Sequence, residues 1–352
     1  MDSVTGAAQS KPTPPPQAIV MQMVMGGWVS KAIATMSRFG IPDLVGKHGA
    51  LTAKEMLAHG VNANADALER LLRACSSLGI FTESEDGHFG VTPLSAVMAR
   101  DAPGSIKGIV ELFSASHSKV WCALGDAVRT GQPQTAAVMG AEFWDYLNAH
   151  PEELEDFGEA MKSNSHASLV GVLEKCDFSA ATKVVDVAGG FGHLAIALLE
   201  KYPKLKATVL DRPELIPVAK QKIALAAGAA SRLEFLGGDM FQSVPPADCY
   251  IMKHIMHDWN DDQCVAILQN CRRAMPGDGR VICVDAVLPP MGNTAGTPGK
   301  LMDLNMLLFI PGKERTRAQW EGIYSRAGLR ITSVTPLADN FGTSIVEGRR
   351  AD

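Results

Sequence analysis

Cysteine is scarce in this sequence and follows no pattern. The 352 residues contain seven cysteines, an odd number, with no Cys-x-x-Cys pair and no Cys/His spacing suited to a metal. A disulfide-scaffold protein is therefore excluded, and reduced thiols in a cytoplasmic protein are expected. Cys249 and Cys283 lie within apolar runs, where a thiol serves as a small hydrophobic side chain.

Long apolar runs and an excess of positive charge are also lacking. No uninterrupted apolar run approaches the ~20 residues that cross a membrane. The formal net charge of −5 and the isoelectric point near 6.0 give no electrostatic reason to bind nucleic acid or an anionic membrane. Residues 1–17 lack the basic start and apolar stretch of a signal peptide, so we expect a flexible leader there.

The composition that remains, 46% hydrophobic and 20% charged, is typical of a globular protein with a core. The length suits two domains or one large one, since a single core rarely exceeds ~250–300 residues. A helical run over residues 19–39, a capping box at Thr52 and Glu55, a second helix over 64–77 and a short hairpin follow one another. This order predicts a winged-helix-like domain.

After about residue 181 the pattern changes to short β-branched runs that alternate with helices. This alternation predicts a mostly parallel sheet with helices on both faces. The expected strands are 183–187, 207–210, 233–236, 249–252 and 280–284, and the expected helices are 193–201, 214–227, 261–275 and 317–327. Residues 329–336 and 344–348 should form a terminal hairpin that inserts one antiparallel strand. The fold class is therefore α/β, with a Rossmann-like sheet.

Four segments are expected along the chain: a leader over residues 1–17, the winged-helix-like domain over 18–110, a helical connector over 111–180, and the sheet domain over 181–352.

A glycine-rich turn follows the first strand of the sheet domain. Gly189, Gly190 and Gly192 precede a helix, so backbone N–H groups can approach a ligand closely. The same residues fit a dinucleotide fingerprint, with Asp211 about 20 residues further on. A nicotinamide-dependent oxidoreductase is therefore one interpretation of this turn.

Three carboxylates favour S-adenosylmethionine over a nicotinamide cofactor. Asp186 lies just before the glycines, where it suits a cationic amino acid group and would repel a pyrophosphate. Asp211 ends the second strand and suits two ribose hydroxyls. Asp239 follows the third strand with two apolar neighbours, Met240 and Phe241, which suits an adenine ring. We therefore expect a methyltransferase-type sheet.

A catalytic signal lies beyond the fourth strand. Asn260 and Gln263 have capping-box spacing, so His257 should lie between the strand end and a helix start, where open α/β sheets bind ligands. Asp285 is expected to end the fifth strand and face the same crevice. A phenol has a pKa near ~10, and a histidine near ~6.5 can remove its proton. We interpret His254 as a structural histidine.

With these residues assembled, the chain resembles the caffeate/isoflavone-type O-methyltransferases and their bacterial natural-product relatives. The resemblance spans about residues 19–349. Its most specific parts, which appear in order behind the glycine-rich turn, are Lys253-x-x-x-His257-Asp258-Trp259, the segment 285–289 and the segment 312–316.

The resemblance implies roles for individual residues. His257 corresponds to the general base, and Asp285 and Glu314 to the acidic residues that orient it. The implied contacts to S-adenosylmethionine, and to the product S-adenosylhomocysteine, come from Asp186, Gly189, Gly190, Gly192, Asp211, Asp239, Met240, Phe241 and Lys253, with Ser165 near the methionine moiety.

Two positions depart from the plant members of the family. Ala188 stands where they usually carry glycine, and we expect it to be tolerated if its φ is negative. Asp285 stands where they carry glutamate, one methylene longer, so Glu314 is the safer partner of His257.

The resemblance also implies an intertwined homodimer that helps roof a pocket for a small aromatic acceptor. Met21, Met23, Met25 and Trp28 would lie in the dimer interface; a methionine-rich internal core is the alternative. The candidate acceptor-pocket residues are Trp144, Phe157, Met161, Met302, Asn305, Met306 and Phe309.

Several alternatives stay open. A DNA-binding winged helix is disfavoured because Arg70 and Arg73 are accompanied by acidic residues in the helix and wing. The interpretation as an oxidoreductase leaves two features unexplained, the segment 239–241 and the terminal hairpin. Relatives that bind S-adenosylmethionine without transferring its methyl group, and N- or C-methylation, fit the same motifs. No metal, membrane or nucleic acid is expected, and the motifs do not identify the acceptor.

Overall fold

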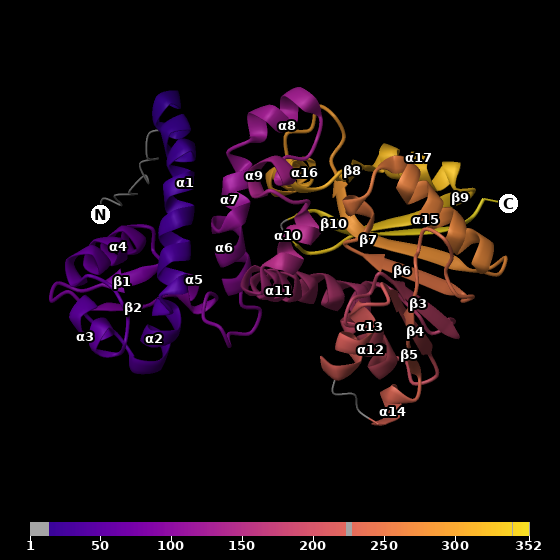
Figure 1. The fold of residues 1–352 in the computed structure, drawn as a ribbon, viewed down its shortest axis with the longest axis horizontal. Coiled ribbons are helices and arrows are strands. Elements are labelled where there is room, and N and C mark those ends of the chain that lie inside the picture. Colours follow the sequence, from indigo (N-terminus) through magenta and orange to yellow (C-terminus); the bar gives the residue numbers. More distant parts are fainter. Residues whose placement is uncertain (1–13, 223–226, 340, 352) are drawn as a thin grey trace, which may run out of the picture. The chain divides into compact units, whose positions relative to one another are not determined.

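The computed structural model describes residues 14–222, 227–339 and 341–351 (Figure 1). Within these ranges the side chains of residues 155, 159, 162–167, 222, 227 and 228 are not described. The chain divides into two compact units, one up to Ala115 and one from Ser116 onward. The expected boundaries at residues 17, 110 and 180 stay predictions.

The first unit contains short helices and one hairpin. Strands β1 and β2 pair antiparallel, as expected. The capping box at Thr52 and Glu55 begins α3, which confirms that prediction. The elements are α1 (Pro16–Arg38), α2 (Ile41–His48), α3 (Ala53–Ala58), α4 (Ala65–Ser77), β1 (Phe81–Glu83), β2 (Phe89–Val91), α5 (Pro93–Ala96) and α6 (Lys107–Ser114).

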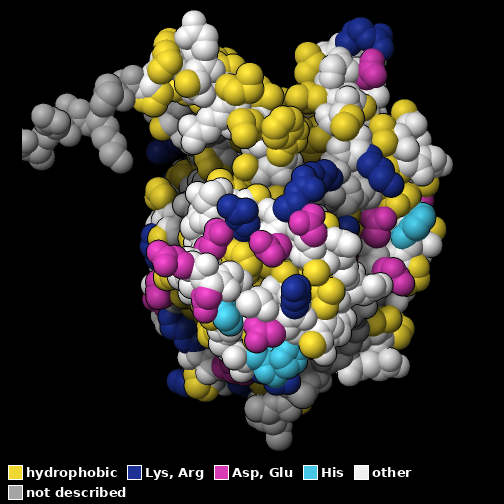
Figure 2. Space-filling view, turned by 90° about the vertical axis from the view of Figure 1, so that its left-hand side faces the viewer, with side chains coloured by type: hydrophobic (Ala, Val, Ile, Leu, Met, Phe, Trp, Pro, Cys, Tyr) yellow, Lys and Arg dark blue, Asp and Glu magenta, His cyan; other side chains and the backbone are white. Residues whose placement is uncertain are grey.

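Helix α1 presents apolar side chains to its surroundings. Met23 is 71% exposed and Trp28 is 73% exposed, and Met21 and Met25 are exposed as well. The alternative of a methionine-rich internal core is therefore wrong, because the core of this unit forms around residues such as Met36 and Leu72 instead. Figure 2 shows hydrophobic side chains gathered over the upper part of the face it draws, above a region of mixed charge.

Helix α1 also has the length and composition that a membrane span requires, although its apolar residues are interrupted. The sequence offered no uninterrupted run there, and the difference arises because mean hydropathy tolerates isolated polar residues. Only 11% of its most apolar window is buried within the chain. One such helix is weak evidence for a membrane span, and an apolar helix face that binds another protein passes the same test.

The second unit is built on a mostly parallel sheet with the strand order β5-β4-β3-β6-β7-β10-β9. Strand β10 pairs antiparallel with both β7 and β9, which confirms the inserted antiparallel strand. The strands are β3 (Lys183–Val187), β4 (Lys206–Asp211), β5 (Leu233–Gly237), β6 (Cys249–Lys253), β7 (Arg280–Leu288), β8 (Arg315–Thr316), β9 (Leu329–Pro336) and β10 (Thr343–Arg350).

Eleven described α-helices and one 3₁₀ turn complete this unit within the part of the chain that the structure describes. They are α7 (Ser116–Trp121), α8 (Leu124–Thr130), α9 (Thr135–Met139), α10 (Phe143–Ala149), α11 (Pro151–Lys175), α12 (His193–Lys201), α13 (Leu215–Lys222), α14 (Ala227–Ala230), η1 (Met256–Asp258), α15 (Asp261–Ala274), α16 (Thr297–Phe309) and α17 (Arg317–Arg326).

Two expectations for this unit were wrong. Helix α16 was not among the expected helices, although residues on it were predicted to line a pocket. Strand β7 was expected to end at Asp285 but continues to Leu288, because its last residues pair with β8. Asp285 therefore lies inside a buried strand instead of at its end.

The sheet is covered on both faces, so its central strands are apolar throughout. Val185 packs toward the cluster that contains α15 and α17, and its neighbour Val184 packs toward the cluster that contains α11 and α12. Such double burial is typical of parallel sheets. The strand order reverses between β3 and β6, and ligands bind open α/β sheets at the carboxyl ends of strands that flank such a reversal.

Candidate active site

The turn after β3 is shaped around a buried carboxylate. Asp186 is 2% exposed, and a Cβ at Gly189 would lie 2.5 Å from its Cγ, so only glycine fits there. Gly190 and Gly192 adopt left-handed backbone conformations with φ of 58° and 76°. Gly192 is the N-cap of α12, so the turn leads directly into a helix N-terminus. This arrangement places a helix N-terminus at the switch point.

Ala188 does not meet the condition of a negative φ under which alanine was expected to be tolerated, because its φ is 55°. A left-handed conformation costs a non-glycine residue roughly 1–2 kcal/mol. The N–H of Ala188 donates to the carbonyl of Leu210 at 2.7 Å, and this hydrogen bond ties the strained residue to β4. The departure from glycine is therefore tolerated at a cost in backbone strain.

Asp211 and Asp239 are held by backbone N–H groups, from the glycine turn and from the loops that carry them. Asp211 accepts hydrogen bonds from the N–H of Gly190 at 2.8 Å and of Arg212 at 2.7 Å. Asp239 accepts from the N–H of Phe241 at 2.8 Å. Both carboxylates thus lie where the carboxyl ends of β4 and β5 meet the glycine turn.

The two apolar residues beside Asp239 are half-buried. The Phe241 ring meets the Trp259 ring edge-on, with centroids 4.8 Å apart. Met240 packs against the same core cluster, and its carbonyl accepts from Asn270 at 2.7 Å. Trp259 was not predicted as a site residue, although its place in the His-Asp-Trp motif was a signal that could have found it.

Lys253 ends β6 beside β3 and interacts electrostatically with Asp186. Burial raises the pKa of Asp186 to about 7, against the opposing charge of Lys253. Burial lowers the pKa of Lys253, against the charges of Asp186 and Asp285. Oδ2 of Asp186 is buried and has no hydrogen-bond partner among the residues described. The side chain of Ser165, the remaining predicted cofactor contact, lies outside the described residues.

His257 lies in the turn η1 after β6, surrounded by three carboxylates. Its Nδ1 donates to Oε1 of Glu314 at 2.8 Å and lies 3.7 Å from Oδ1 of Asp285. Its Nε2 lies 3.5 Å from Oδ1 of Asp258, which was not predicted as a site residue. The structure therefore brings His257, Asp285 and Glu314 together, with Glu314 as the direct partner.

Close backbone packing holds this centre together. A Cβ at Gly312 would overlap the carbonyl oxygen of His257, so only glycine allows the two segments to meet. The N–H of Lys313 donates to that same carbonyl at 2.9 Å. The N–H of Glu314 donates to Asp303 at 2.8 Å, which fixes the position of the carboxylate that reaches His257.

Arg315 is fully buried and acts as a brace for the turn. Its guanidinium donates to the carbonyl of Met256 at 2.9 Å, to the carbonyl of Trp259 at 2.7 Å and to Asp261 at 3.0 Å. Sequence analysis did not assign Arg315 a role, although it lies within the segment 312–316. Its hydrogen bonds show that this segment positions both ends of η1.

Three neighbouring carboxylates reverse the effect of burial on the pKa of His257. Burial alone would lower the pKa of His257, but the charge and hydrogen bond of Glu314 and the charges of Asp258 and Asp285 raise it to about 10. Burial raises the pKa of Asp285 to about 7 and that of Asp258 to about 6, with the charge of His257 opposing both. The imidazole is thus made strongly basic by its surroundings.

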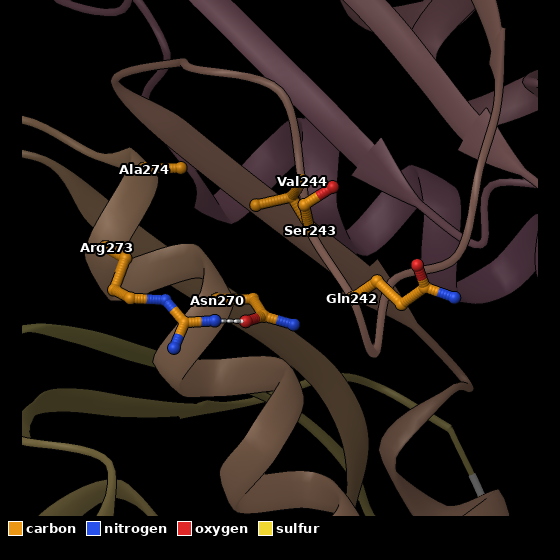
Figure 3. A pocket seen from close by; sticks show the side chains of 6 residues that line it. All are labelled: Gln242, Ser243, Val244, Asn270, Arg273 and Ala274. Carbon is orange, nitrogen blue, oxygen red and sulfur yellow. Dashed lines mark hydrogen bonds between the residues drawn. The ribbon is translucent and has the colours of Figure 1, made fainter.

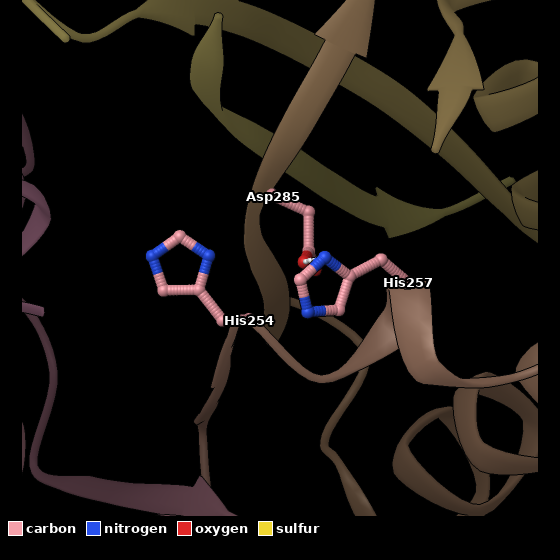
Figure 4. A group of neighbouring side chains, drawn as sticks. All are labelled: His254, His257 and Asp285. Carbon is pink, nitrogen blue, oxygen red and sulfur yellow. Dashed lines mark ion pairs between the residues drawn. The ribbon is translucent and has the colours of Figure 1, made fainter. Parts of the chain in front are cut away.

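Atoms of His254, His257 and Asp285 that could bind a metal lie within 4.8 Å of one another (Figure 4). This spacing makes the three residues candidate ligands. Nδ1 of His257 is occupied by Glu314. The expected absence of a metal stays a prediction.

An aromatic cluster contains most of the predicted acceptor-pocket residues. Phe143 contacts the rings of Trp144, Phe157 and Phe309 at centroid distances of 5.1 to 5.6 Å. Met302 and Met306 pack into the same cluster.

The other two predicted pocket residues, Asn305 and Met161, are placed by neighbouring helices. Oδ1 of Asn305 accepts from Nε1 of Trp121 at 3.0 Å. Met161 is half-buried one helical turn after Phe157 on α11. His117, which stacks on Phe309, and Trp121 were missed because α7 carries no recognisable motif.

A surface hollow lies apart from these residues, beside the loop after β5 (Figure 3). It is lined by Gln242, Ser243, Val244, Asn270, Arg273 and Ala274. Arg273 donates to Asn270, so its guanidinium is engaged within the hollow's own wall. No predicted site residue lines it, but two of its lining residues contact the candidate site. Asn270 donates to the carbonyl of Met240 at 2.7 Å, and Gln242 donates to Asp239 at 3.1 Å.

Comparison with known proteins decides the family. The model of the O-methyltransferase domain matches residues 121–330, and that of the O-methyltransferase dimerisation domain matches residues 21–101. The chain belongs to the O-methyltransferase family. This O-methyltransferase is 34% identical to the phenazine O-methyltransferase PhzM of Lysobacter antibioticus, over 95% of this chain and 96% of the relative.

Two further comparisons agree. The mitomycin biosynthesis 6-O-methyltransferase of Streptomyces lavendulae is 34% identical over 94% of each chain. Among solved structures, the O-methyltransferase NcsB1 from neocarzinostatin biosynthesis, in complex with S-adenosylmethionine and 2-hydroxy-5-methyl naphthoic acid, has a TM-score of 0.77 and 30% identity, with 92% of this chain and 96% of that chain covered.

The protein is therefore an S-adenosylmethionine-dependent O-methyltransferase of the secondary-metabolite type. The residues of the turn fit this cofactor, because Asp186 offers a buried unpaired oxygen and two further carboxylates follow β4 and β5. The nicotinamide interpretation has lost its support. The dimerisation domain supports a homodimer, whereas the absence of nucleic acid and the cytoplasmic location stay predictions.

Proposed function

We propose that this O-methyltransferase transfers the methyl group to a phenolic hydroxyl of a small aromatic acceptor, with His257 as the general base. The observation that carries the proposal is the 2.8 Å hydrogen bond from Nδ1 of His257 to Glu314, at the carboxyl edge of the sheet. This bond fixes the tautomer and orientation of the imidazole and leaves Nε2 for the acceptor. Asp285 adds a buried negative charge 3.7 Å away.

The predicted cofactor contacts are retained in this proposal. The positive charge of S-adenosylmethionine would lie near Asp186, its ribose near Asp211 and its adenine near Asp239 and the two apolar residues that follow. Bound there, the cofactor supplies an electrophilic methyl group. The proposed contacts are Ser165, Asp186, Gly189, Gly190, Gly192, Asp211, Asp239, Met240, Phe241 and Lys253.

The proton balance follows from the raised pKa. A phenol has a pKa near ~10, and the surroundings raise the pKa of His257 to about 10. A proton can therefore pass from the phenol to Nε2 with little change in free energy, and Glu314 and Asp285 stabilise the imidazolium that results. At neutral pH the imidazole of the free enzyme holds a proton, so turnover should rise with pH as that proton is lost.

The acceptor pocket would be formed by the aromatic cluster on α10, α11 and α16. Its predicted residues are Trp144, Phe157, Met161, Met302, Asn305, Met306 and Phe309. Flat aromatic side chains and flexible methionines suit a planar acceptor. The hydroxynaphthoic acid in the NcsB1 complex and the phenazine in the name of the Lysobacter enzyme are planar aromatic compounds, which supports this class of acceptor.

We further propose that the exposed apolar side chains of α1 are covered by a second copy of the chain. Met21, Met23, Met25 and Trp28 lie on a helix within the matched dimerisation domain, and their exposure would be unfavourable in a monomer.

The test compares His257→Ala with His59→Ala, a matched change at an exposed histidine. Turnover of a phenolic acceptor should fall by roughly 10²–10⁴ in His257→Ala and stay unchanged in His59→Ala. Calorimetric titration with S-adenosylhomocysteine should give one site per chain and similar affinity in all three proteins. Unchanged turnover in His257→Ala would remove the assignment of the base and favour N-methylation, C-methylation or a different use of the bound cation.

A further inference from the structure

His254 is held in an unusual backbone conformation beside the proposed base. Its φ is 55°, a left-handed value that non-glycine residues seldom adopt, and its N–H donates to the carbonyl of Val284 at 2.9 Å. Among the described residues only Ala188 shares a positive φ without being glycine. Strained residues of this kind cluster at functional sites, so the position of the His254 ring calls for an explanation.

Helix α11 fixes the far side of the ring. Nε2 of His254 lies 3.0 Å from the hydroxyl of Ser168, a residue that is 2% exposed. This contact occupies one ring nitrogen and restrains the rotation of the ring. No hydrogen bond of the other nitrogen, Nδ1, is found within the described part of the chain, so this nitrogen has capacity for a ligand atom.

The near side of the ring faces the proposed base. The rings of His254 and His257 have centroids 5.8 Å apart and an interplanar angle of 35°. Figure 4 shows one ring nitrogen of His254 pointing toward His257 and Asp285 and the other pointing away from them. Oδ1 of Asp285 is buried and lacks a hydrogen-bond partner among the described side chains and backbone. Polar atoms from three residues thus converge with unused hydrogen-bonding capacity.

The neutral state of the His254 imidazole suits hydrogen bonding to the acceptor better than removal of a proton from it. Burial, followed by the positive charges of Lys253 and His257, lowers the pKa of His254 well below its usual value. A neutral imidazole donates at one nitrogen and accepts at the other. A hydroxyl group can satisfy Nδ1 of His254 whichever way the bond to Ser168 runs, because a hydroxyl both donates and accepts.

We propose that His254 is a specificity-determining residue that binds the acceptor through a second oxygen, on the ring carbon next to the hydroxyl that is methylated. The ring centroids of His254 and His257 lie 5.8 Å apart, and one nitrogen of the first ring lies within 4.8 Å of one nitrogen of the second. Hydrogen bonds of about 2.8–3.0 Å from two such nitrogens reach two oxygens on neighbouring ring carbons. His257 then takes the proton of one hydroxyl, while the hydrogen bond from His254 to the second oxygen fixes the orientation of the acceptor ring. This proposal rests on the proposed function, and it adds a second point of attachment.

The test compares naphthalene-2,3-diol with 2-naphthol, which lacks the second hydroxyl. Calorimetric binding to the full-length enzyme saturated with S-adenosylhomocysteine measures recognition without turnover, and kcat and KM with S-adenosylmethionine measure its effect on the reaction. The wild-type enzyme should prefer the diol by about 10–100-fold, the usual penalty for leaving a buried hydrogen-bonding group unpaired.

Three variants distinguish recognition of the second hydroxyl by His254 from a purely structural role of this residue. His254→Phe keeps a flat ring without the nitrogens, and it should reduce the preference for the diol to within about 3-fold of unity, mainly through KM. His254→Asn tolerates the left-handed conformation and keeps hydrogen-bonding groups, so it should retain part of the preference. Ser168→Ala leaves the backbone at residue 254 unchanged and should lower the preference by releasing the ring. His59→Asn is the matched control.

Several outcomes would overturn the proposal. Equal binding of the two naphthols to the wild-type enzyme would do so, as would no binding of the diol up to its solubility limit. If His254→Phe weakened the binding of naphthalene-2,3-diol and of 2-naphthol by the same factor, the role of the His254 ring would be structural. If that variant does not fold, an unchanged preference in Ser168→Ala is decisive against the proposal. Failure of the proposed function appears separately, as unchanged turnover in His257→Ala with the diol preference intact.

Discussion

The segments at the ends of β4 and β5 and the centre around His257 lie on one edge of the same sheet, yet their carboxylates differ in burial and in hydrogen bonding. Asp211 accepts a hydrogen bond from the N–H of Gly190 in the glycine turn, and Asp239 accepts one from the N–H of Phe241 in its own loop, both at 2.8 Å. Asp285 and Glu314 are buried, and each has one carboxylate oxygen with no hydrogen-bond partner among the residues described.

This difference matches the chemistry of the two ends. Carboxylates that are preoriented and not fully buried, such as Asp211 and Asp239, suit polar contacts to a ligand that is bound and released, whereas Asp186 on the same side is buried. A base that must hold a proton during methyl transfer needs negative charge that water does not screen. The buried pair therefore raises the pKa of His257, while the loop carboxylates hold their places for a ligand.

The largest expected effect comes from breaking the packing behind His257. Gly312→Ala introduces a Cβ that overlaps the carbonyl oxygen of His257, so the 312–316 segment must move and carry Glu314 away. Turnover should fall by at least ~10² because misplaced catalytic groups are costly. Steady-state kinetics and thermal unfolding measure the effect. Gly322→Ala, where a Cβ meets nothing within 4 Å, is the control and should behave as wild type.

Removing the charge of Glu314 tests whether buried negative charge sets the pKa of His257. Because Glu314 raises the pKa of His257, Glu314→Gln should lower that pKa and shift the acidic limb of the kcat/KM profile to lower pH. Turnover should fall by about 10–100-fold as the imidazolium loses its partner. Glu321→Gln, an exposed change on α17, should leave the profile in place. An unmoved limb in Glu314→Gln would mean that Glu314 does not set the basicity.

Asp211→Asn tests whether the carboxylate at the end of β4 contributes to cofactor binding. The affinity for S-adenosylhomocysteine should weaken by roughly 10-fold, because a charge-assisted acceptor for ribose hydroxyls becomes neutral. The pH profile of kcat/KM should keep its shape, since the change lies on the other half of the edge. Calorimetry gives the affinity, and Asp262→Asn at an exposed ion pair is the control. A shifted profile would show that the two halves are electrostatically coupled.

Ala188→Gly carries the smallest expected effect. Glycine adopts a φ of 55° without strain, so the free energy of unfolding should rise by about 1 kcal/mol, or roughly 2–4 °C in Tm. Calorimetric unfolding without ligand measures it. A drop in stability would show that the Cβ of Ala188 contributes packing that outweighs the strain.

Much of the site could be predicted from the sequence because it depends on local patterns. A strand that runs into glycines, a carboxylate two or three residues beyond a strand, and a capping box after His257 each concern fewer than about a dozen residues. Parallel strands then bring those ends to one edge, whatever the details of the helices between them. The expected strand at 183–187 and the expected helix at 193–201 agree with β3 and α12 to the residue.

What could not be predicted depends on register between distant segments. Asp285 lies inside β7, and not at its end, because Val287 pairs with Arg315. Arg315 braces η1 from 56 to 59 positions away in the chain. The φ of Ala188 follows from its hydrogen bond to β4 and not from its own preference.

The sequence by itself determined the class of sheet and the cofactor, and it nominated His257 as the proposed base, since strand period, glycine turns and capping boxes are short-range properties of the chain. Only the tertiary structure decided which carboxylate contacts His257 and how basic that histidine becomes. It also decided that His254 faces His257 from a strained backbone. Those properties depend on burial and on distances of a few ångströms between segments far apart in sequence, because electrostatic interactions strengthen steeply as water is excluded.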